Sequence, residues 1–168
     1  MSIVVDIQTI SIAIASASVF AAAIYYILQL KHQSKSRRTD SYWRITSTLN
    51  TKEYLEALFE VWSLDFRDYN DFTSKYGTPL SRRNPIWISL SMVGNLFEGA
   101  AYLYRNGLMD YHTVSQFPIT GTWEKVKAIA EGARKQLGLS GMWTDFEWLY
   151  NEMQMRRQKL EQKGVKVD

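Results

Sequence analysis

The side chains best suited to proton transfer near neutral pH are the two histidines, and neither has catalytic neighbours in the sequence. His32 lies among lysines beside an apolar run, which favours an interfacial role. His112 follows Asp110, but no second His or Cys lies at metal-ligand spacing and no nucleophile–base pattern surrounds it. We therefore expect no catalytic residue and no metal site. General acid–base chemistry by His112 is the alternative.

The chain contains no cysteine. This excludes disulfides, thiolate nucleophiles and cysteine-ligated metals, and it fits a reducing compartment. Gly94, Gly99 and Gly107 are separated from one another, so no glycine-rich loop is present to bind a phosphate. We expect no bound cofactor.

Two sets of acidic residues recur at helical spacing. Paired carboxylates hold two metals in some helical bundles, but that arrangement also uses Glu-x-x-His elements, which this chain lacks. A calcium-binding loop needs alternate acidic positions around a central glycine, which the second set does not have. We interpret both sets as solvated helix faces: Glu53, Glu56 and Glu60, then Asp65, Asp68 and Asp71.

Glu98 is the single charged residue in the apolar stretch over residues 86–104. A carboxylate in such surroundings must be paired, hydrogen-bonded or protonated. We expect a buried ion pair with Arg134, with Arg44 as the second choice of partner. A structural ion pair explains Glu98 better than catalysis does.

An apolar run over residues 7–30 predicts where in the cell the protein lies. It contains no charged side chain. As a helix it reaches about 36 Å, enough to cross a hydrocarbon core of roughly 30 Å with some tilt. Ala13, Ala17 and Ala21 recur at intervals of four, a small-residue pattern that lets membrane helices pack closely. The sequence predicts a membrane anchor with a transmembrane packing face.

The flanks of this run predict its orientation. Positive residues favour the cytoplasmic side of a span, and they gather after it, whereas residues 1–6 contain none. We expect the amino terminus outside and the rest of the chain in the cytoplasm. The membrane flank comprises Tyr25, Tyr26, Lys31, Lys35, Arg37 and Arg38. Its tyrosines suit the headgroup level and its basic residues suit anionic lipid head groups.

The rival interpretation of this run is a cleaved signal peptide, because Ala15-Ser16-Ala17 imitates a cleavage site. Against it, the segment before the run carries no positive charge and the run continues well past that site. The formal charge of +3 comes from the basic flank, since 16 residues of each sign follow residue 38. A neutral domain lacks the clustered positive face that nucleic-acid binding requires, so we expect no nucleic-acid partner.

Beyond the anchor, apolar residues recur at threes and fours and strand patterns are weak, which predicts an all-α fold. We expect an anchor over residues 1–30, a basic linker over 31–40, a bundle of five or six helices over 41–155 and an exposed tail over 156–168. Helix-capping residues are expected at Asn50, Asn84, Asp110, Thr122 and Ser140. The buried residues are expected to include Trp62, Phe66, Leu96, Phe97, Trp123, Phe146 and Leu149.

The helix over residues 86–104 is apolar almost all round, so it fits either the centre of the bundle or a second membrane span. Glu98 and Asn95 near its middle are costly in lipid, and basic residues flank both of its ends. These features favour the bundle.

The chain resembles an uncharacterised prokaryotic family of small proteins with one amino-terminal span and a cytoplasmic helical domain of unknown function. The matching elements are the span with its basic stop and two later segments, Phe97…Gly107-Leu108-Met109-Asp110 and Trp123…Arg134…Phe146-Glu147-Trp148-Leu149. The resemblance implies membrane anchorage and a helical domain. It supplies no catalytic residues.

We expect a non-enzymatic, membrane-anchored interaction or accessory module, a candidate subunit of a larger membrane complex. Its partners would be the bilayer and either a second copy or another membrane protein. The alternative is a membrane-tethered enzyme or small-molecule sensor with an interhelical pocket near Glu98 and His112.

Overall fold

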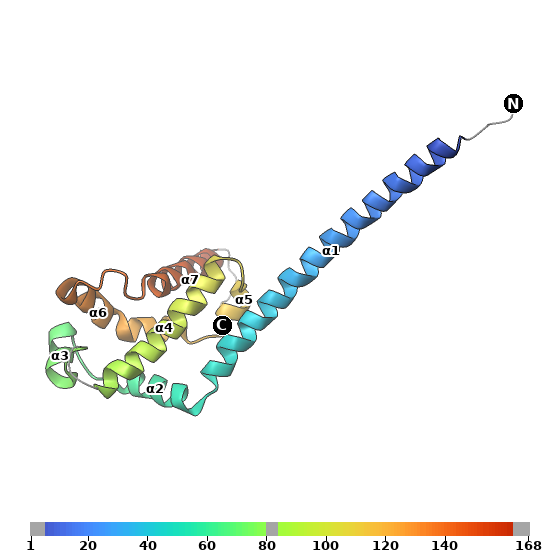
Figure 1. Cartoon of the computed structure of the whole chain (residues 1–168). Coiled ribbons are helices and arrows are strands. Elements are labelled where there is room, and N and C mark those ends of the chain that lie inside the picture. The colour runs from blue at the N-terminus through green and yellow to red at the C-terminus, as the bar shows by residue number, and fades with distance from the viewer. Residues whose placement is uncertain (1–5, 80–83, 163–168) are drawn as a thin grey trace. The chain divides into compact units, whose positions relative to one another are not determined.

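The computed structural model describes residues 6–79 and 84–162, apart from the side chains of Gln8 and Arg38. Within these residues the regular structure is helical throughout and no strand occurs, which confirms the predicted all-α class. The helices are α1 (Ile7–Leu49), α2 (Lys52–Ser63), α3 (Tyr69–Tyr76), α4 (Pro85–Arg105), α5 (Tyr111–Val114), α6 (Ile119–Leu137) and α7 (Thr144–Gln162) (Figure 1).

The chain divides into two compact units, residues 1–40 and 41–168, and the division falls inside α1. In the described part, α1 is the one helix long and apolar enough to cross a membrane. None of its most apolar stretch is buried by other residues. The basic linker over residues 31–40 continues the same helix.

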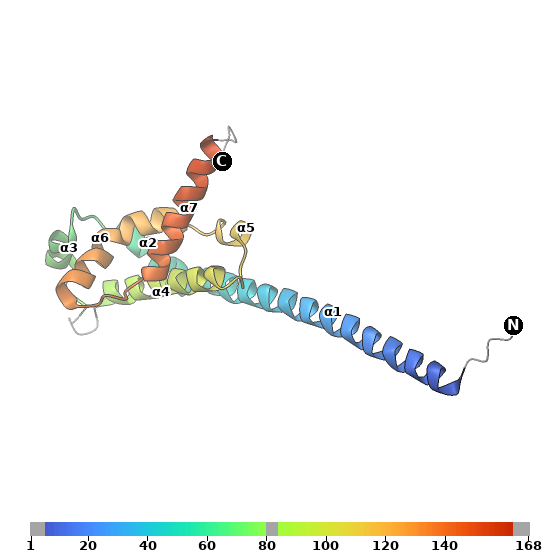
Figure 2. The same ribbon diagram turned by 90° about the horizontal axis from the view of Figure 1, so that it is seen from above.

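The second unit is a helical domain built around α4. Helix α4 packs against α2 on one side and α7 on another, while α6 contacts α2, α3 and α7 (Figure 2). The buried residues of α4 include Trp87, Leu90, Val93 and Phe97. The apolar character of α4 therefore reflects its place at the centre of the domain, where neighbouring helices cover several of its faces.

Three helix ends follow the expected chemistry. The side chain of Asn84 accepts hydrogen bonds from the first backbone N–H groups of α4, whose first residue is Pro85. Asp110 caps α5 by accepting from Thr113. At the other end of a helix, Gly138 follows α6 with a left-handed φ of 68°, a conformation in which glycine carries no side-chain strain.

Three other expected caps were wrong. Thr51, not Asn50, caps α2 by accepting from the Tyr54 N–H. Helix α6 begins at Ile119, so Thr122 lies within it and donates its hydroxyl to the Pro118 carbonyl over 2.6 Å. Helix α7 begins at Thr144 rather than at Ser140. The helix starts differ from the expected ones by a few residues, so the expected caps do not face the first N–H groups.

The predicted core was largely right and failed at Trp62. Phe97, Trp123, Phe146 and Leu149 are buried, whereas Phe66 and Leu96 are partly buried. Trp62 is 39% exposed, because its ring lies at the edge of the interface of α2 with α6, where its N–H donates to Thr122. An amphipathic ring at such an edge buries its body and satisfies its one donor.

Candidate functional site

The expected membrane-flank residues lie in α1. The described flank side chains are all exposed: Tyr25, Tyr26, Lys31, Lys35 and Arg37. The side chain of Arg38 lies outside the described residues. Ala13, Ala17 and Ala21 are also exposed and lie at the spacing that places them on one side of α1. The structure thus leaves both the flank and the small-residue face available to solvent or lipid.

The two histidines lie in separate units. His32 is exposed on α1, and His112 is exposed on α5, where its Nε2 lies 3.3 Å from Gln116 Nε2. Among the described residues, no group of three or more His, Asp and Glu side chains is arranged to hold a metal ion. His112 has no carboxylate or hydroxyl nucleophile hydrogen-bonded to its ring in this part of the chain.

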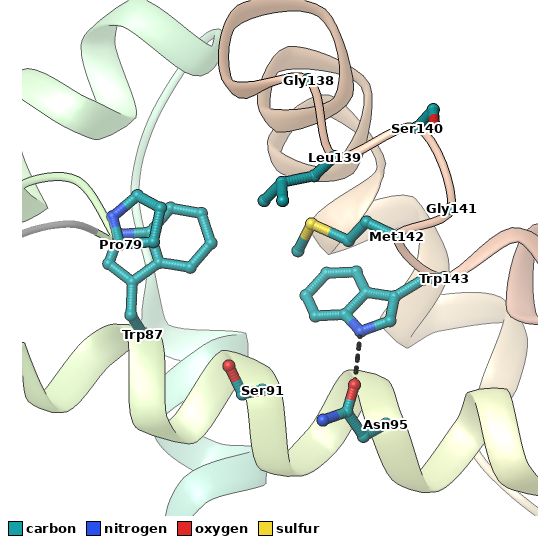
Figure 3. Close-up of a pocket in the computed structure, with 10 residues that line it drawn as sticks. All are labelled: Pro79, Trp87, Ser91, Asn95, Gly138, Leu139, Ser140, Gly141, Met142 and Trp143. Atoms are coloured by element: carbon teal, nitrogen blue, oxygen red, sulfur yellow. Dashed lines mark hydrogen bonds between the residues drawn. The ribbon is translucent and has the colours of Figure 1, made fainter.

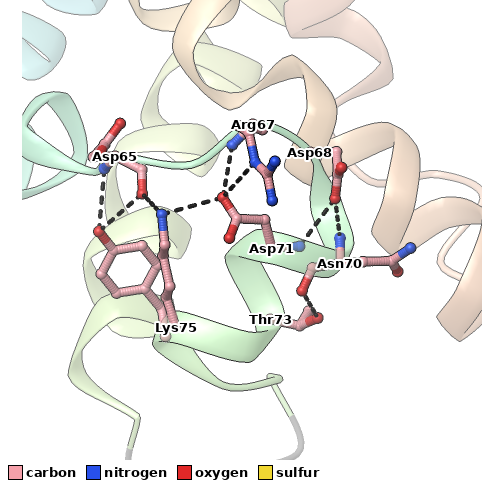
Figure 4. A network of polar contacts seen from close by, with 8 residues as sticks. Asp65, Arg67, Asp68, Asn70, Asp71, Thr73 and Lys75 are labelled. Carbon is pink, nitrogen blue, oxygen red and sulfur yellow. Dashed lines mark hydrogen bonds and ion pairs between the residues drawn. The ribbon is translucent and has the colours of Figure 1, made fainter.

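The acidic residues around α3 form a local network rather than a metal site (Figure 4). Asp68 caps α3 by accepting the N–H groups of Asn70 and Asp71. The Asp71 carboxylate accepts the Arg67 N–H over 2.9 Å and lies 3.1 Å from the Lys75 ammonium. These contacts, led by the Arg67 N–H, hold the pKa of Asp71 below its ordinary value. The network fixes the turn into α3.

The acidic residues of α2 line a groove of about 440 Å³ against α4. Glu56 lies 3.5 Å from Lys52, and Glu60 accepts a hydrogen bond from Ser89. The opposite wall exposes Ile88 and Met92, which are 59% and 40% exposed. Because Glu56 and Glu60 already have ordinary local partners, the groove provides charge and apolar area rather than catalytic groups.

The structure gives Glu98 a different partner from the expected one. Its carboxylate Oε2 accepts the backbone N–H of Phe146 over 2.7 Å. Phe146 is the third residue of α7, and the first N–H groups of a helix have no acceptor within the helix itself. Glu98 on α4 therefore caps α7 from a neighbouring helix, and its negative charge faces the positive end of the helix dipole.

Arg134 pairs with Glu147 instead of Glu98. Its Nη1 lies 2.5 Å from the Glu147 carboxylate, and its Nε donates to the Met142 carbonyl over 2.8 Å. Its guanidinium also lies over the Trp123 ring, 5.9 Å from the ring centre. Arg134 thus ties the end of α6 to the segment that leads into α7. This is a structural role.

Burial perturbs one phenol in the core. Tyr54 is 1% exposed, its ring packs edge-on against Phe97, and its hydroxyl has no hydrogen-bond partner in the described structure. Burial raises the pKa of Tyr54 well above its ordinary value, so the phenol stays neutral. It contributes packing rather than acid–base chemistry.

A pocket of about 480 Å³ lies between α4 and the segment that joins α6 to α7 (Figure 3). Trp87 lies on one side of it and Met142 and Trp143 on the other, while Ser91 and Asn95 of α4 lie beneath. Trp143 donates its indole N–H to Asn95 Oδ1 over 3.1 Å. The pocket has the size and the mainly apolar lining of a small-molecule site.

The exposed side of α2 carries a surface that the sequence did not predict. Leu55, Phe59 and Trp62 recur one turn apart and are 39%, 61% and 39% exposed. Phe59 packs edge-on against Trp62, with ring centres 6.0 Å apart. We call these three residues the α2 stripe. The helical spacing was visible in the sequence, but which side of the helix faces the core was not.

Structural roles account for the charged groups that stood out in the sequence. Glu98, Arg134 and Asp71 each hold an element in place through a hydrogen bond or ion pair. What the described surface offers beyond this is binding area: the α2 stripe, the acidic groove and the apolar pocket.

Searches of curated proteins and of solved structures gave no match to the chain. A family described as "Domain of unknown function (DUF4760)" matches residues 12–153, which include most of α1 and all of α2 to α6. The match runs through both compact units and into α7. With the greater part of its length covered by this match, the chain belongs to the DUF4760 family.

Proposed function

We propose that the protein is a non-enzymatic membrane-anchored module whose helical domain presents the α2 stripe to a protein partner. The observation that carries the proposal is the exposure of Leu55, Phe59 and Trp62 on one side of α2. Single exposed apolar residues are ordinary on protein surfaces, but a contiguous set is typical of an interaction site. Aromatic residues are also the ones most enriched among the energetically dominant residues of interfaces.

The stripe is partly organised before any partner binds. The Trp62 N–H is held by the Thr122 hydroxyl over 3.1 Å, and Phe59 is held against the Trp62 ring. Side chains that are already ordered lose less conformational entropy on association. The other side of α2 carries Glu53, Glu56 and Glu60. A partner with apolar residues flanked by basic ones would match both sides of the helix.

The anchor in this proposal is the first unit. Helix α1 is long and apolar enough to span a bilayer, and its basic flank suits the anionic head groups of the cytoplasmic leaflet. The domain then lies in the cytoplasm and the amino terminus outside. A reporter that is active only in the cytoplasm should therefore work when fused after Asp168. Labelling of that end from outside intact cells would contradict this orientation.

A second contact within the membrane is consistent with the same proposal. Ala13, Ala17 and Ala21 place small side chains at intervals of four along one side of α1. Ala17→Leu should weaken any association made through this side, whereas Ala15→Leu adds the same bulk on another side of the helix.

The alternative function, a sensor or enzyme with its pocket near Glu98 and His112, has less support. Glu98 is engaged by the Phe146 N–H, and His112 is exposed. Neither residue lines the pocket or the groove described above.

The proposal is tested by purifying the tagged full-length protein from its own membranes in mild detergent and identifying what copurifies. The proposed partner should copurify in a fixed ratio and should be lost with Phe59→Glu. Tyr102→Glu is the matched control, because Tyr102 is 57% exposed on α4 and lies outside the stripe. Equal recovery with both variants, or purification of the wild-type protein alone, would contradict the proposal.

A further inference from the structure

The pocket between α4 and the α6–α7 segment is distinct from the α2 stripe. Its floor is formed by Ser91 and Asn95, which lie one helical turn apart on α4. Leu139, Ser140 and Gly141 are exposed at its mouth. Trp87 and Trp143 form opposite walls, and Figure 3 shows the Ser91 hydroxyl directed into the space between the two indoles.

The wall formed by Trp143 is held in a strained conformation. Trp143 has a φ of 54°, a left-handed value that bulky residues seldom adopt. Its ring lies so close to Gly94 that a Cβ on residue 94 would overlap it, and its N–H is held by Asn95. Backbone strain of this kind persists only where surrounding contacts enforce it, and it gathers at binding and catalytic sites.

The lining specifies the chemistry of a ligand. None of the residues that line the pocket carries a formal charge, so a charged ligand would lose hydration without gaining an ion pair. The indole N–H groups are already used, since Trp87 donates to the Gly77 carbonyl over 3.1 Å and Trp143 to Asn95. Trp87 and Trp143 are only 6% and 3% exposed, so a ligand meets a small part of each ring together with Leu139, which is 45% exposed. This lining favours a neutral, apolar ligand body.

On the α4 side of the pocket, two polar side chains can still form hydrogen bonds with a ligand. Asn95 uses its oxygen for Trp143, which leaves its amide N–H groups to donate. The Ser91 hydroxyl is exposed and donates or accepts. Both lie on the same side of α4, so one acceptor on a ligand can reach the pair.

We propose that this pocket binds a neutral, mainly apolar small molecule that carries a hydrogen-bond acceptor. Its apolar body lies against Leu139 and the exposed parts of Trp87 and Trp143, and its acceptor takes a hydrogen bond from Asn95 or Ser91. The pocket shares no residue with the α2 stripe or with the anchor. A failed ligand-binding test would therefore leave the proposed function unaffected.

The test uses the full chain in nanodiscs with all six tryptophans replaced by 5-fluorotryptophan. Quinoline, which has an aromatic body and a ring nitrogen acceptor, is titrated while fluorine NMR signals are followed, each assigned by a single Trp→Phe substitution. The Trp87 and Trp143 signals should shift and saturate. The signal of Trp43, which is 62% exposed, reports any non-specific effect and should not follow them.

Two substitutions separate specific binding from partition into lipid. Ser91→Phe fills the pocket and should abolish the saturating shifts. Lys127→Phe adds the same ring at an exposed position of α6 outside the pocket and should leave them unchanged. Shifts that survive Ser91→Phe, or that never saturate, would overturn the site.

The hydrogen bond is tested with naphthalene, which has the same shape and no acceptor. Quinoline should bind at least five-fold more tightly than naphthalene to the wild-type protein. Asn95→Asp keeps an oxygen for Trp143 but removes the amide donors, so it should reduce the quinoline affinity and narrow this difference, while the Ser91 hydroxyl remains. Equal affinities in the wild-type protein would overturn the assignment of Asn95 and Ser91 as donors.

Discussion

Glu98 and Phe146, on different helices and 48 residues apart, are joined by a hydrogen bond of 2.7 Å from the Phe146 N–H to the Glu98 carboxylate. The bond links α4, at the centre of the domain, to the first turn of α7. It shows how a charged residue is accommodated within an apolar helix, because its carboxylate accepts a backbone N–H. The carboxylate compensates an N–H group that the helix itself leaves without an acceptor.

Removal of this cap should destabilise the domain. Glu98→Ala is expected to lower the free energy of unfolding by about 1.5–3 kcal/mol, the usual range for a hydrogen bond to a charged group. Glu98→Gln keeps an oxygen acceptor and should cost less. Urea unfolding of both variants in the full chain measures the difference. If both variants lose the same free energy of unfolding, the hydrogen bond from the Phe146 N–H does not contribute the stability expected here.

Two glycines of α6 should respond in opposite ways to alanine. A Cβ at Gly132 would overlap the base of the Tyr69 ring, which is buried and cannot swing away, so Gly132→Ala should destabilise by about 1–3 kcal/mol. At Gly121 nothing lies within 4 Å of the added atom. Gly121→Ala should therefore stabilise by up to about 1 kcal/mol through helix propensity. Thermal unfolding checks the sign of each change, and a common sign would refute the packing argument.

Asp71 should make stability depend on pH in the acidic range. Its pKa is lowered in the folded state, chiefly by the Arg67 N–H, so its charged form stabilises the fold. This contribution is present above the ordinary carboxyl pKa of about 4 and is lost as the pH falls through the lower folded value. Asp71→Asn should therefore be less stable than the wild-type protein at neutral pH, and this difference in stability should shrink as the pH falls.

Unfolding midpoints measured from pH 7 down to the acid limit test this trend. Asp65→Asn is the control, because the network in Figure 4 uses the Asp65 backbone carbonyl, which accepts from Lys75 over 3.0 Å. If the difference in unfolding midpoint between Asp71→Asn and the wild-type protein stays constant with pH, the charge of the Asp71 carboxylate does not stabilise the fold.

The sequence predicted the features that depend on local chemistry. Asn84 and Asp110 act as caps, and Gly138 ends α6, because these residue types satisfy helix ends wherever the chain places them. The all-α class followed from apolar spacing along the chain. The burial of Phe97 and Trp123 followed from the same pattern.

The features that the sequence missed depend on which helix lies beside which. Glu98 was expected to pair with Arg134, but its carboxylate accepts the backbone N–H of Phe146 in α7 instead. Trp62 was expected in the core, but it lies at the edge of α2 with its N–H on Thr122. The pocket also combines residues from α4 with a segment more than 40 positions later. Such pairings arise from tertiary packing, which a single sequence does not encode in its local periodicity.

The central claim, that the α2 stripe binds a protein partner, is tested most directly by photo-crosslinking in living cells. A photoreactive phenylalanine analogue replaces Phe59 in the full-length protein, and a second version carries it at Tyr102, which is similarly exposed. The account predicts one discrete protein adduct from position 59 and none from position 102. The same adducts from both positions, or no protein adduct from position 59, would contradict it.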